Sequence, residues 1–388
     1  MPVIDSPFGT AESSAPAEVA AKLAQLRERL PEIGAPAVAL TTSGAVAWLT
    51  AGLTNRIEAG AMASAMWVVI TSDGAIALTT NVERARIDAE HGLSERGLRL
   101  EAIDWFAGDA GLVAAACEWA GSPADVIASD GHAAFGIDAE DDLAALRLAL
   151  APPERERLAA LGRDAASALE HALRTWQPGE RDLDLQARVA GGLERTGAFG
   201  ACLIVGGDDR VERFRHPLAI GAPVSRLAMA VVVAERGGLH AAATRMACAD
   251  GLSDRVRDAW SAALGVEARM LEAGQVGQTY GDVMAACERA YVDAGHGGAW
   301  REHYQGGPIG YRQREFEVVP IQSHSRWFRQ RIEPGHAVAW NPSVAGGGKT
   351  EDTFLIDDEG VHCMTRTGEW PEIAGRTAIL DISTGAAA

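Results

Sequence analysis

The sequence predicts a chain of two domains, an α/β domain followed by an α+β domain in which helices pack on a curved antiparallel sheet. Its 388 residues exceed the roughly 250–300 residues at which a single hydrophobic core stops growing. Short apolar segments first alternate with helical segments, which is typical of a mixed sheet, and long amphipathic helices with paired strands follow. Pro152 and Pro153 end one element and begin another, so we place the domains at residues 1–150 and 151–388.

The elements of the first domain are predicted from apolar periodicity and turn signals. A helix begins at Pro16, with Ser13 and Ser14 as its cap signal. The runs AVALTT and AVAWLTAG predict strands, and WVVITSDGAIALTT predicts a hairpin around its Ser-Asp-Gly turn. The remaining elements are expected in the order helix 82–92, strand 99–105, helix 111–121, strand 125–131 and helix 138–150. No glycine-rich phosphate loop interrupts this domain, so we expect it to be a scaffold.

The second domain differs in kind because its helices are longer and its strands come in pairs. Two amphipathic helices flank the turn QPGE, and a strand follows at CLIVGGDDR. A strand pair and two more long helices come next, and strands resume after residue 316. The expected segments are helices 153–175, 183–196, 253–272 and 280–294 and strands 202–210, 227–235 and 239–246. This pattern indicates helices layered on an antiparallel sheet.

Composition and charge exclude several classes of partner. The formal net charge of −18 disfavours nucleic acid and anionic membranes, because phosphate binding needs a basic surface. The five cysteines are odd in number and form no CxxC pair, which argues against a disulfide framework and a cysteine zinc site. The N-terminal residues show no signal-peptide pattern, and no apolar run is long enough to span a bilayer. We expect a cytoplasmic protein that acts on a small molecule.

Five landmarks in the second domain, taken in order, resemble the creatinase/prolidase/methionine aminopeptidase family. They are the helix pair with its QPGE turn, the segment FRHPLA, the strand pair ending in TR, the segment GGPIGYRQRE, and GHAVAWNPSVAGGGKTEDTFLI. The resemblance covers residues 150–380 and implies the "pita-bread" fold of this peptidase M24 family. The preceding part is similar to the N-terminal domain of creatinases and prolidases. The resemblance also implies a homodimer.

The same resemblance implies that the metal site of the family has been dismantled. The hydrolases of the family hold two divalent ions with two aspartates, a histidine and two glutamates. In this chain the corresponding positions carry Val231, Ala242, Gly307, Asn341 and Glu351. One carboxylate without an imidazole cannot hold two ions, since even a single catalytic zinc usually takes three protein ligands. We therefore expect no metal and no other cofactor.

The residues that remain suggest chemistry like that of creatinase, the metal-free member of the family. His216 is the candidate general acid and base, because a histidine changes protonation near neutral pH. Glu351 and Glu315 are candidates for binding a cationic or amide N–H group or for raising the basicity of the histidine. Arg245 and Arg314 suit a substrate carboxylate. The other expected pocket residues are Gln305, Tyr311, Asn341 and Trp340, with His240 as a substitute base ranked below His216.

Each of these residues also has a structural interpretation. His216 can be a loop histidine that bonds to backbone, Glu351 an ordinary charge at a strand end, and Arg245 a support for the sheet. The leading hypothesis is a metal-independent hydrolase or lyase acting on a C–N bond of a small amino-acid-like substrate of the amide or guanidino class. The first alternative is a catalytically altered pseudoenzyme that serves as a binding module. The second is a metallopeptidase similar to Xaa-Pro aminopeptidases.

Overall fold

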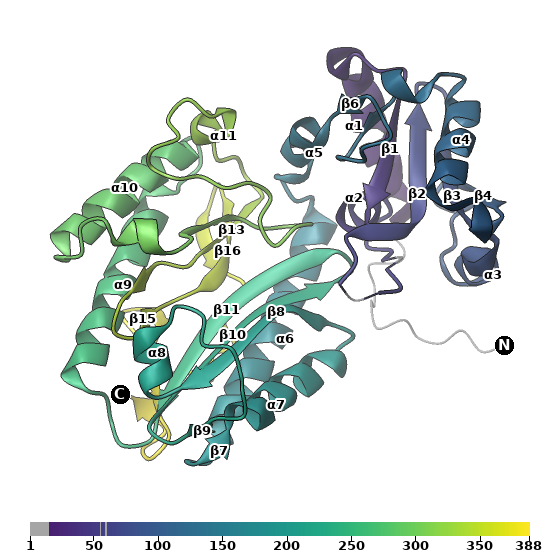
Figure 1. Ribbon diagram of the computed structural model, residues 1–388. Coiled ribbons are helices and arrows are strands. Elements are labelled where there is room, and N and C mark those ends of the chain that lie inside the picture. Colours follow the sequence, from purple (N-terminus) through teal and green to yellow (C-terminus); the bar gives the residue numbers. More distant parts are fainter. Residues whose placement is uncertain (1–14, 55, 59) are drawn as a thin grey trace. The chain divides into compact units, whose positions relative to one another are not determined.

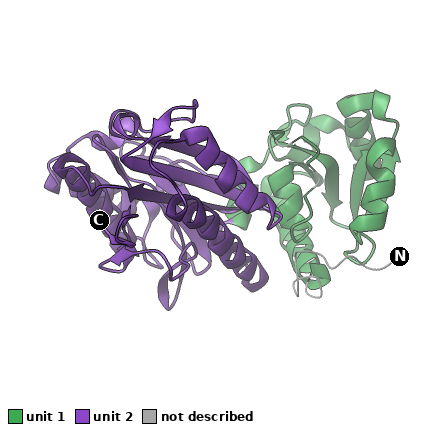
Figure 2. Cartoon of the chain, turned by 90° about the horizontal axis from the view of Figure 1, so that it is seen from below, with its two compact units in different colours: residues 1–147, 237–239 green, residues 148–236, 240–388 purple. Residues whose placement is uncertain are grey.

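The computed structural model describes residues 15–54, 56–58 and 60–388. Its contacts divide the chain into two compact units (Figure 2). The first unit contains residues 1–147 with 237–239, and the second contains residues 148–236 with 240–388. No helix in the part of the chain that the structure describes is long and apolar enough to cross a membrane.

Unit 1 is built on one mixed sheet with the strand order β4-β3-β2-β1-β5-β6. The β1–β2 and β2–β3 pairs are antiparallel, and the other pairs are parallel. Its strands are β1 (Ala37–Thr42), β2 (Ala63–Thr71), β3 (Ala75–Thr80), β4 (Arg99–Ile103), β5 (Ala128–Ser129) and β6 (Ile137–Asp138). Its helices are α1 (Ala15–Ile33), α2 (Ser43–Leu49), α3 (Asn81–Glu90), α4 (Gly108–Ala120) and α5 (Glu140–Arg147). The expected hairpin is the β2–β3 pair, in which Ile70 lies opposite Ala75.

One expectation in this unit is wrong. The run AVAWLTAG was expected as a strand, but the chain forms α2 there. Thr42 caps this helix, because its hydroxyl accepts a hydrogen bond of 3.3 Å from the N–H of Ala45. A short run of buried apolar residues fits a buried strand and a buried helix equally well, and the cap decides between them. Ser13 and Ser14, the expected cap of α1, lie outside the described residues.

Unit 2 contains two main sheets with long helices around them (Figure 1). One sheet has the order β21-β20-β11-β10-β8, and the other has the order β12-β13-β16-β17. The strands at their edges include β17 (Gly360–Cys363), β20 (Leu380–Asp381) and β21 (Ala386–Ala387). The strands that matter for the site are β8 (Phe199–Gly207), β10 (Leu227–Arg236), β11 (Leu239–Cys248), β12 (Gly306–Pro308), β13 (His336–Trp340), β15 (Gly348–Lys349) and β16 (Asp352–Asp357). The long helices are α6 (Pro152–Arg174), α7 (Asp182–Glu194), α9 (Asp254–Ala273) and α10 (Tyr280–Asp293). Figure 1 shows the α6–α7 and α9–α10 pairs flanking the strands.

The two sheets of unit 2 meet where β11 approaches the beginning of β16. The N–H of Ala242 donates to the hydroxyl of Thr353 at 2.8 Å, and this hydroxyl donates to the carbonyl of Ala242 at 2.9 Å. Two residues further along each segment, the N–H of Thr244 donates to the carbonyl of Glu351 at 2.8 Å. These bonds join the sheets side by side, so residues of both sheets converge at this junction.

Candidate functional site

The five positions that the family resemblance assigns to metal ligands converge at the junction of the two sheets. Val231 lies on β10, which neighbours β11 and its Ala242. Glu351 directly precedes β16 and accepts a hydrogen bond of 3.2 Å from the Thr244 hydroxyl. Gly307 lies on β12, and Asn341 directly follows β13, the strand between β12 and β16. The fold therefore brings together positions that lie far apart in the sequence.

The side chains at this junction do not fit a centre of two metal ions. Val231 packs in an apolar cluster with Ile204 and Met229, and Ala242 carries only a methyl group. Within the described residues, no three histidine, cysteine, aspartate or glutamate side chains lie together so that they could hold a metal. Of the five positions, only Glu351 carries a carboxylate, and the cations Lys349 and Arg314 act on it.

Lys349 is the main feature of the site that sequence reasoning missed. Its side chain is buried, with 4% of its surface exposed, and it lines a pocket of about 130 Å³. Burial lowers the pKa of Lys349, and the nearby Glu351 carboxylate opposes this shift. Burial raises the pKa of Glu351, which Lys349 and then Arg314 oppose. The only sequence signal was the rarity of lysine in this chain.

Arg314 and Asn341 have buried polar atoms without a hydrogen-bond partner among the described residues, although Nη1 of Arg314 forms an ion pair with Glu317 at 3.6 Å. Nε and Nη1 of Arg314 are buried without a hydrogen-bond partner within the described residues, and so is Oδ1 of Asn341. Arg314 packs against Gly307. Any larger residue at position 307 would place its Cβ only 3.1 Å from Cδ of Arg314. Gly307, at the position that the family resemblance assigns to the histidine ligand, thus leaves room for the Arg314 side chain. Buried polar atoms without partners are costly, so such atoms point to a ligand or ordered water.

A histidine pair lies near Lys349. The Nε2 atoms of His216 and His303 are 3.1 Å apart, and Nδ1 of His303 is 2.5 Å from the carbonyl oxygen of Tyr304. Because a carbonyl only accepts, His303 carries its proton on Nδ1 and its Nε2 accepts from His216. His216 then has a free lone pair on Nδ1. His303 was not predicted from the sequence.

Both imidazoles are held neutral. Burial, with smaller contributions from Lys349 and His216, lowers the pKa of His303 to about 2. Burial and then the charge of Lys349 also lower the pKa of His216. A neutral imidazole with a free lone pair is the form that a general base needs at neutral pH.

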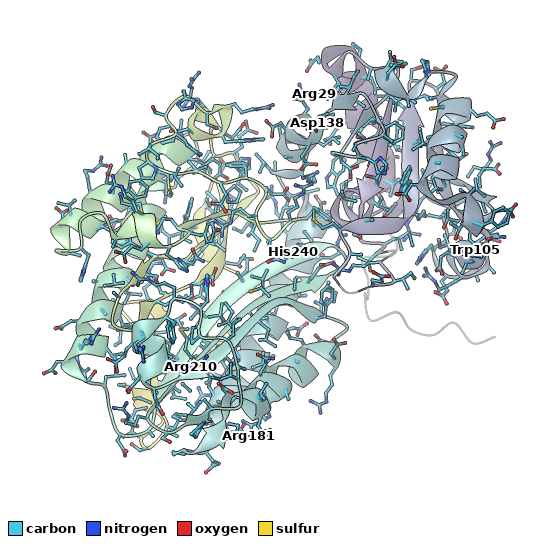
Figure 3. The ribbon with its side chains drawn as sticks, in the orientation of Figure 1. Arg29, Trp105, Asp138, Arg181, Arg210 and His240 are labelled. Carbon is cyan, nitrogen blue, oxygen red and sulfur yellow. The ribbon has the colours of Figure 1, made fainter. Side chains whose placement is uncertain are left out.

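The loop that carries His216 is fixed by a buried carboxylate. Asp182 is fully buried and accepts from the backbone N–H groups of Ile220 and Gly221 and from Arg210, at 3.1, 2.7 and 2.8 Å. Arg215 donates to Ser343 at 3.0 Å and to Glu302 at 2.9 Å. Arg210, labelled in Figure 3, belongs to the short helix α8 (Asp209–Arg213). These contacts hold the chain on both sides of His216.

Arg245, expected to bind substrate, is placed elsewhere. It donates to Glu170 at 3.2 Å, to Asp352 at 2.8 Å and to the carbonyl of Thr365 at 2.7 Å, and it is almost fully buried. Thr244 contacts Glu351, and successive side chains of a strand point to opposite faces. The Arg245 guanidinium is therefore part of the packing of β11 on α6 and does not reach the pocket.

Three other expected pocket residues have their polar groups bound within the protein. The hydroxyl of Tyr311 donates to Glu154 at 2.7 Å, and Glu315 accepts from the N–H of Tyr311 at 2.8 Å. The side chain of Gln305 accepts from Tyr291 at 2.9 Å and donates to the carbonyl of His303 at 2.7 Å. These contacts hold loops around the site, and they leave Gln305 as a support for His303.

His240 and Trp340 are also buried. Figure 3 shows His240 at the beginning of β11, where Nδ1 lies 3.1 Å from the carbonyl of Gly310 and Nε2 lies 3.3 Å from Glu235. Both ring nitrogens thus face protein atoms. Trp340 is fully buried, and its Nε1 has no hydrogen-bond partner in the described part of the chain. Among the described residues that line the pocket, none is one of the residues expected from the sequence. His216 and Glu351 are connected to the pocket through Lys349, whose charge acts on the pKa of both.

Comparisons with known proteins agree with this architecture. The family model for metallopeptidase family M24 matches residues 156–358. A comparison with curated protein sequences gives no match. The prolidase from Pyrococcus horikoshii OT3 is similar in structure, with a TM-score of 0.73, 15% identity, and coverage of 89% of this chain and 98% of that chain. The Xaa-Pro dipeptidase from Bacillus anthracis gives a TM-score of 0.70, 19% identity, and coverage of 90% and 98%.

A further similar structure is the X-Pro aminopeptidase from Thermotoga maritima MSB8, with a TM-score of 0.68, 16% identity, and coverage of 89% of this chain and 97% of that chain. At these identities the likeness concerns the fold. The expected fold, an α/β domain followed by an α+β pita-bread domain, is confirmed.

Proposed function

The chain belongs to metallopeptidase family M24, and we propose that it is a member that hydrolyses a C–N bond of a small amino-acid-like amide without a metal ion. His216 is the general acid and base of this proposal. The observation that carries it is the 3.1 Å contact between His216 and His303, near the buried Lys349. The side chains at the five former ligand positions support the metal-free part of the proposal.

The proposed reaction needs one base, one acid and a centre of positive charge. Nδ1 of His216 takes a proton from water, and the hydroxide attacks the amide carbonyl carbon to form a tetrahedral intermediate. The cationic side chains of Lys349 and Arg314 stabilise the negative charge that develops on oxygen. His216 then gives the proton to the departing nitrogen, the C–N bond breaks, and a carboxylic acid and an amine are released. His303 holds the ring of His216 throughout.

The alternative proposal is a binding module that has lost catalysis. Nε of Arg314 and Oδ1 of Asn341, which have no hydrogen-bond partner among the described residues, favour a ligand but do not require turnover. A metallopeptidase, as the family model would suggest, needs ligands that Val231, Ala242, Gly307 and Asn341 do not provide. Of the three hypotheses, the metal-independent hydrolase gives a role to the largest number of these polar groups.

A panel of N-acyl amino acids and small amides tests the proposal. We expect turnover of at least one compound in the presence of a chelator, and a loss of about 10²–10⁴-fold in kcat for His216→Ala. His324→Ala changes an exposed histidine outside the site and serves as the matched control. Turnover that appears only with added manganese or zinc, or that survives in His216→Ala, would refute the proposed mechanism. Binding without turnover across the panel would favour the binding module.

A further inference from the structure

The pocket that Lys349 lines is bordered by the segments that carry the histidine pair. Arg215 and Glu302 line it, and each directly precedes one histidine of the pair. Arg215 donates to Glu302 at 2.9 Å, and the Nε2 atoms of the two histidines are 3.1 Å apart. Two successive contacts therefore join the same two segments beside the pocket.

Ser343 and Lys349 place two buried hydrogen-bond donors in this pocket. They lie opposite each other where β14 (Ser343–Val344) pairs with β15. Side chains of directly opposite residues in such a pair lie on the same face. Both residues line the pocket, and they are only 2% and 4% exposed. The hydroxyl and the ammonium group are therefore close neighbours.

Neither donor has an acceptor in the part of the chain that the structure describes. The Ser343 hydroxyl accepts from Arg215 at 3.0 Å, but no described group accepts its own proton. The Lys349 ammonium group has no hydrogen bond and no carboxylate at ion-pair distance among the described residues. Glu351, whose charge acts on Lys349, does not line the pocket. Buried donors without acceptors are costly, so these two point to a ligand that supplies acceptor oxygens.

The charges that line the pocket include two cations without a carboxylate at ion-pair distance in the described part of the chain. The charged lining residues are Glu212, Arg213, Arg215, Glu302 and Lys349. Glu302 pairs with Arg215 at 2.9 Å, and Glu212 pairs with Arg255, which lies outside the lining, at 3.8 Å. Arg213 and Lys349 remain. Two positive charges are thus unmatched in a chain whose formal net charge is −18.

A run of glycines leaves one wall of the pocket without side chains. Gly346, Gly347 and Gly348 all line it. The φ angles of Gly346 and Gly347 are 107° and 99°, which residues with a Cβ rarely adopt. A ligand can therefore approach the backbone closely at this wall.

A phosphate group matches this pocket better than a carboxylate does. A phosphate ester carries about −1.5 to −2 charges at pH 7 and three strong acceptor oxygens. These values match the two unmatched cations and the two buried donors. A carboxylate has a single charge and would leave one of the cations unmatched.

We propose that Ser343, Lys349 and Arg213 bind a phosphate group, either as the free ion or as part of a small phosphate ester. The site goes beyond the proposed function, because binding requires no hydrolysis. Lys349 also serves the proposed hydrolysis, so a bound phosphate would compete with the amide substrate.

Titration calorimetry with inorganic phosphate, in a buffer without phosphate or sulfate, tests the proposal. We expect the unmodified protein to bind phosphate, and Lys349→Met and Ser343→Ala to bind it about 10–100-fold more weakly, the effect of losing one hydrogen bond to a charged group. Arg213→Met should weaken binding by a smaller factor, because Arg213 is exposed. The matched control is Arg195→Met, which changes an exposed arginine outside the pocket lining and should leave binding unchanged. No binding to the unmodified protein, or unchanged binding in Lys349→Met, would overturn the proposal.

A parallel titration with methyl phosphate identifies the source of the phosphate group. Tighter binding of inorganic phosphate supports a site for the free ion. Tighter binding of methyl phosphate supports a site for a phosphate ester.

The presence of only two lysines, Lys22 and Lys349, permits a test without any variant. Protein labelled with ¹³C at Cε of lysine gives two side-chain signals. Lys22, which donates to Glu18 at 2.6 Å, is the internal control. We expect inorganic phosphate to shift the Lys349 signal and to leave the Lys22 signal in place, and a Lys349 signal that does not move would overturn the proposal. Phosphate binding without turnover of any amide would refute only the proposed function, and turnover without phosphate binding would refute only this inference.

Discussion

Replacing Arg245 by methionine distinguishes a structural arginine from a substrate ligand. Its guanidinium connects Glu170 of α6, Asp352 of β16 and the carbonyl of Thr365. Methionine would leave the two carboxylates buried without their main cation. Breaking a buried ion pair by removing one partner costs about 3–5 kcal/mol. For a domain of this size, about 2–4 °C of melting temperature is lost per kcal/mol, so we expect a decrease of roughly 6–20 °C.

Differential scanning calorimetry at pH 7 measures this decrease. Arg181→Met is the matched control, because Arg181 pairs with Asp184 at 2.7 Å on the surface and its removal should leave the melting temperature essentially unchanged. In parallel, Arg245→Met should keep turnover of the amide substrate at a temperature below its transition. An Arg245→Met protein that melts with the unmodified protein and loses turnover would refute the structural assignment and return Arg245 to the candidate site.

Three further variants test contacts of unit 2 by urea denaturation. Tyr311→Phe removes the bond to Glu154, which should cost about 1.5–3 kcal/mol, and an unchanged midpoint would contradict the contact. Burial raises the pKa of Glu267 from 4.5 to about 8, so the folded state keeps a proton that the unfolded state releases. Stability should therefore fall as the pH rises from about 4.5 to 8, and Glu267→Gln should remove this decline. Burial lowers the pKa of His336 from 6.5 to about 4, so the unfolded state binds the extra proton. Stability should fall as the pH drops from about 6.5 to 4, and this decline should be smaller in His336→Gln.

Local signals in the sequence were sufficient for most elements of the fold. The turn Ser-Asp-Gly located the β2–β3 hairpin, and proline at residues 152 and 153 located the beginning of α6. The run that forms α2 was misread, because six of its seven residues are buried and this pattern carries no periodicity that separates a strand from a helix. The cap at Thr42 was the signal that could have corrected this prediction.

The candidate site was only partly predictable, because its decisive contacts are long-range. The order of the landmarks located Val231, Ala242, Gly307, Asn341 and Glu351, since the fold fixes which strands are neighbours. His303 is 87 residues from His216, and no local pattern marked it as a partner.

Burial and hydrogen bonding decided the rest. Tyr311 and Gln305 looked like pocket residues in the sequence, but their polar groups are bound within the protein. Lys349 was not singled out in the sequence, yet the structure buries its side chain beside the pocket. A sequence shows which polar groups exist, whereas only the fold shows which of them lack a partner.

Metal content tests the central claim, that the pocket at the junction of the two sheets does not hold the two ions of its family. The purified protein is incubated with manganese, cobalt, iron and zinc, desalted, and subjected to elemental analysis. The side chains at Val231, Ala242, Gly307 and Asn341, with Lys349 nearby, predict near-zero stoichiometry for all four metals. Two tightly held ions per chain would contradict the account and bring the metallopeptidase hypothesis to first place.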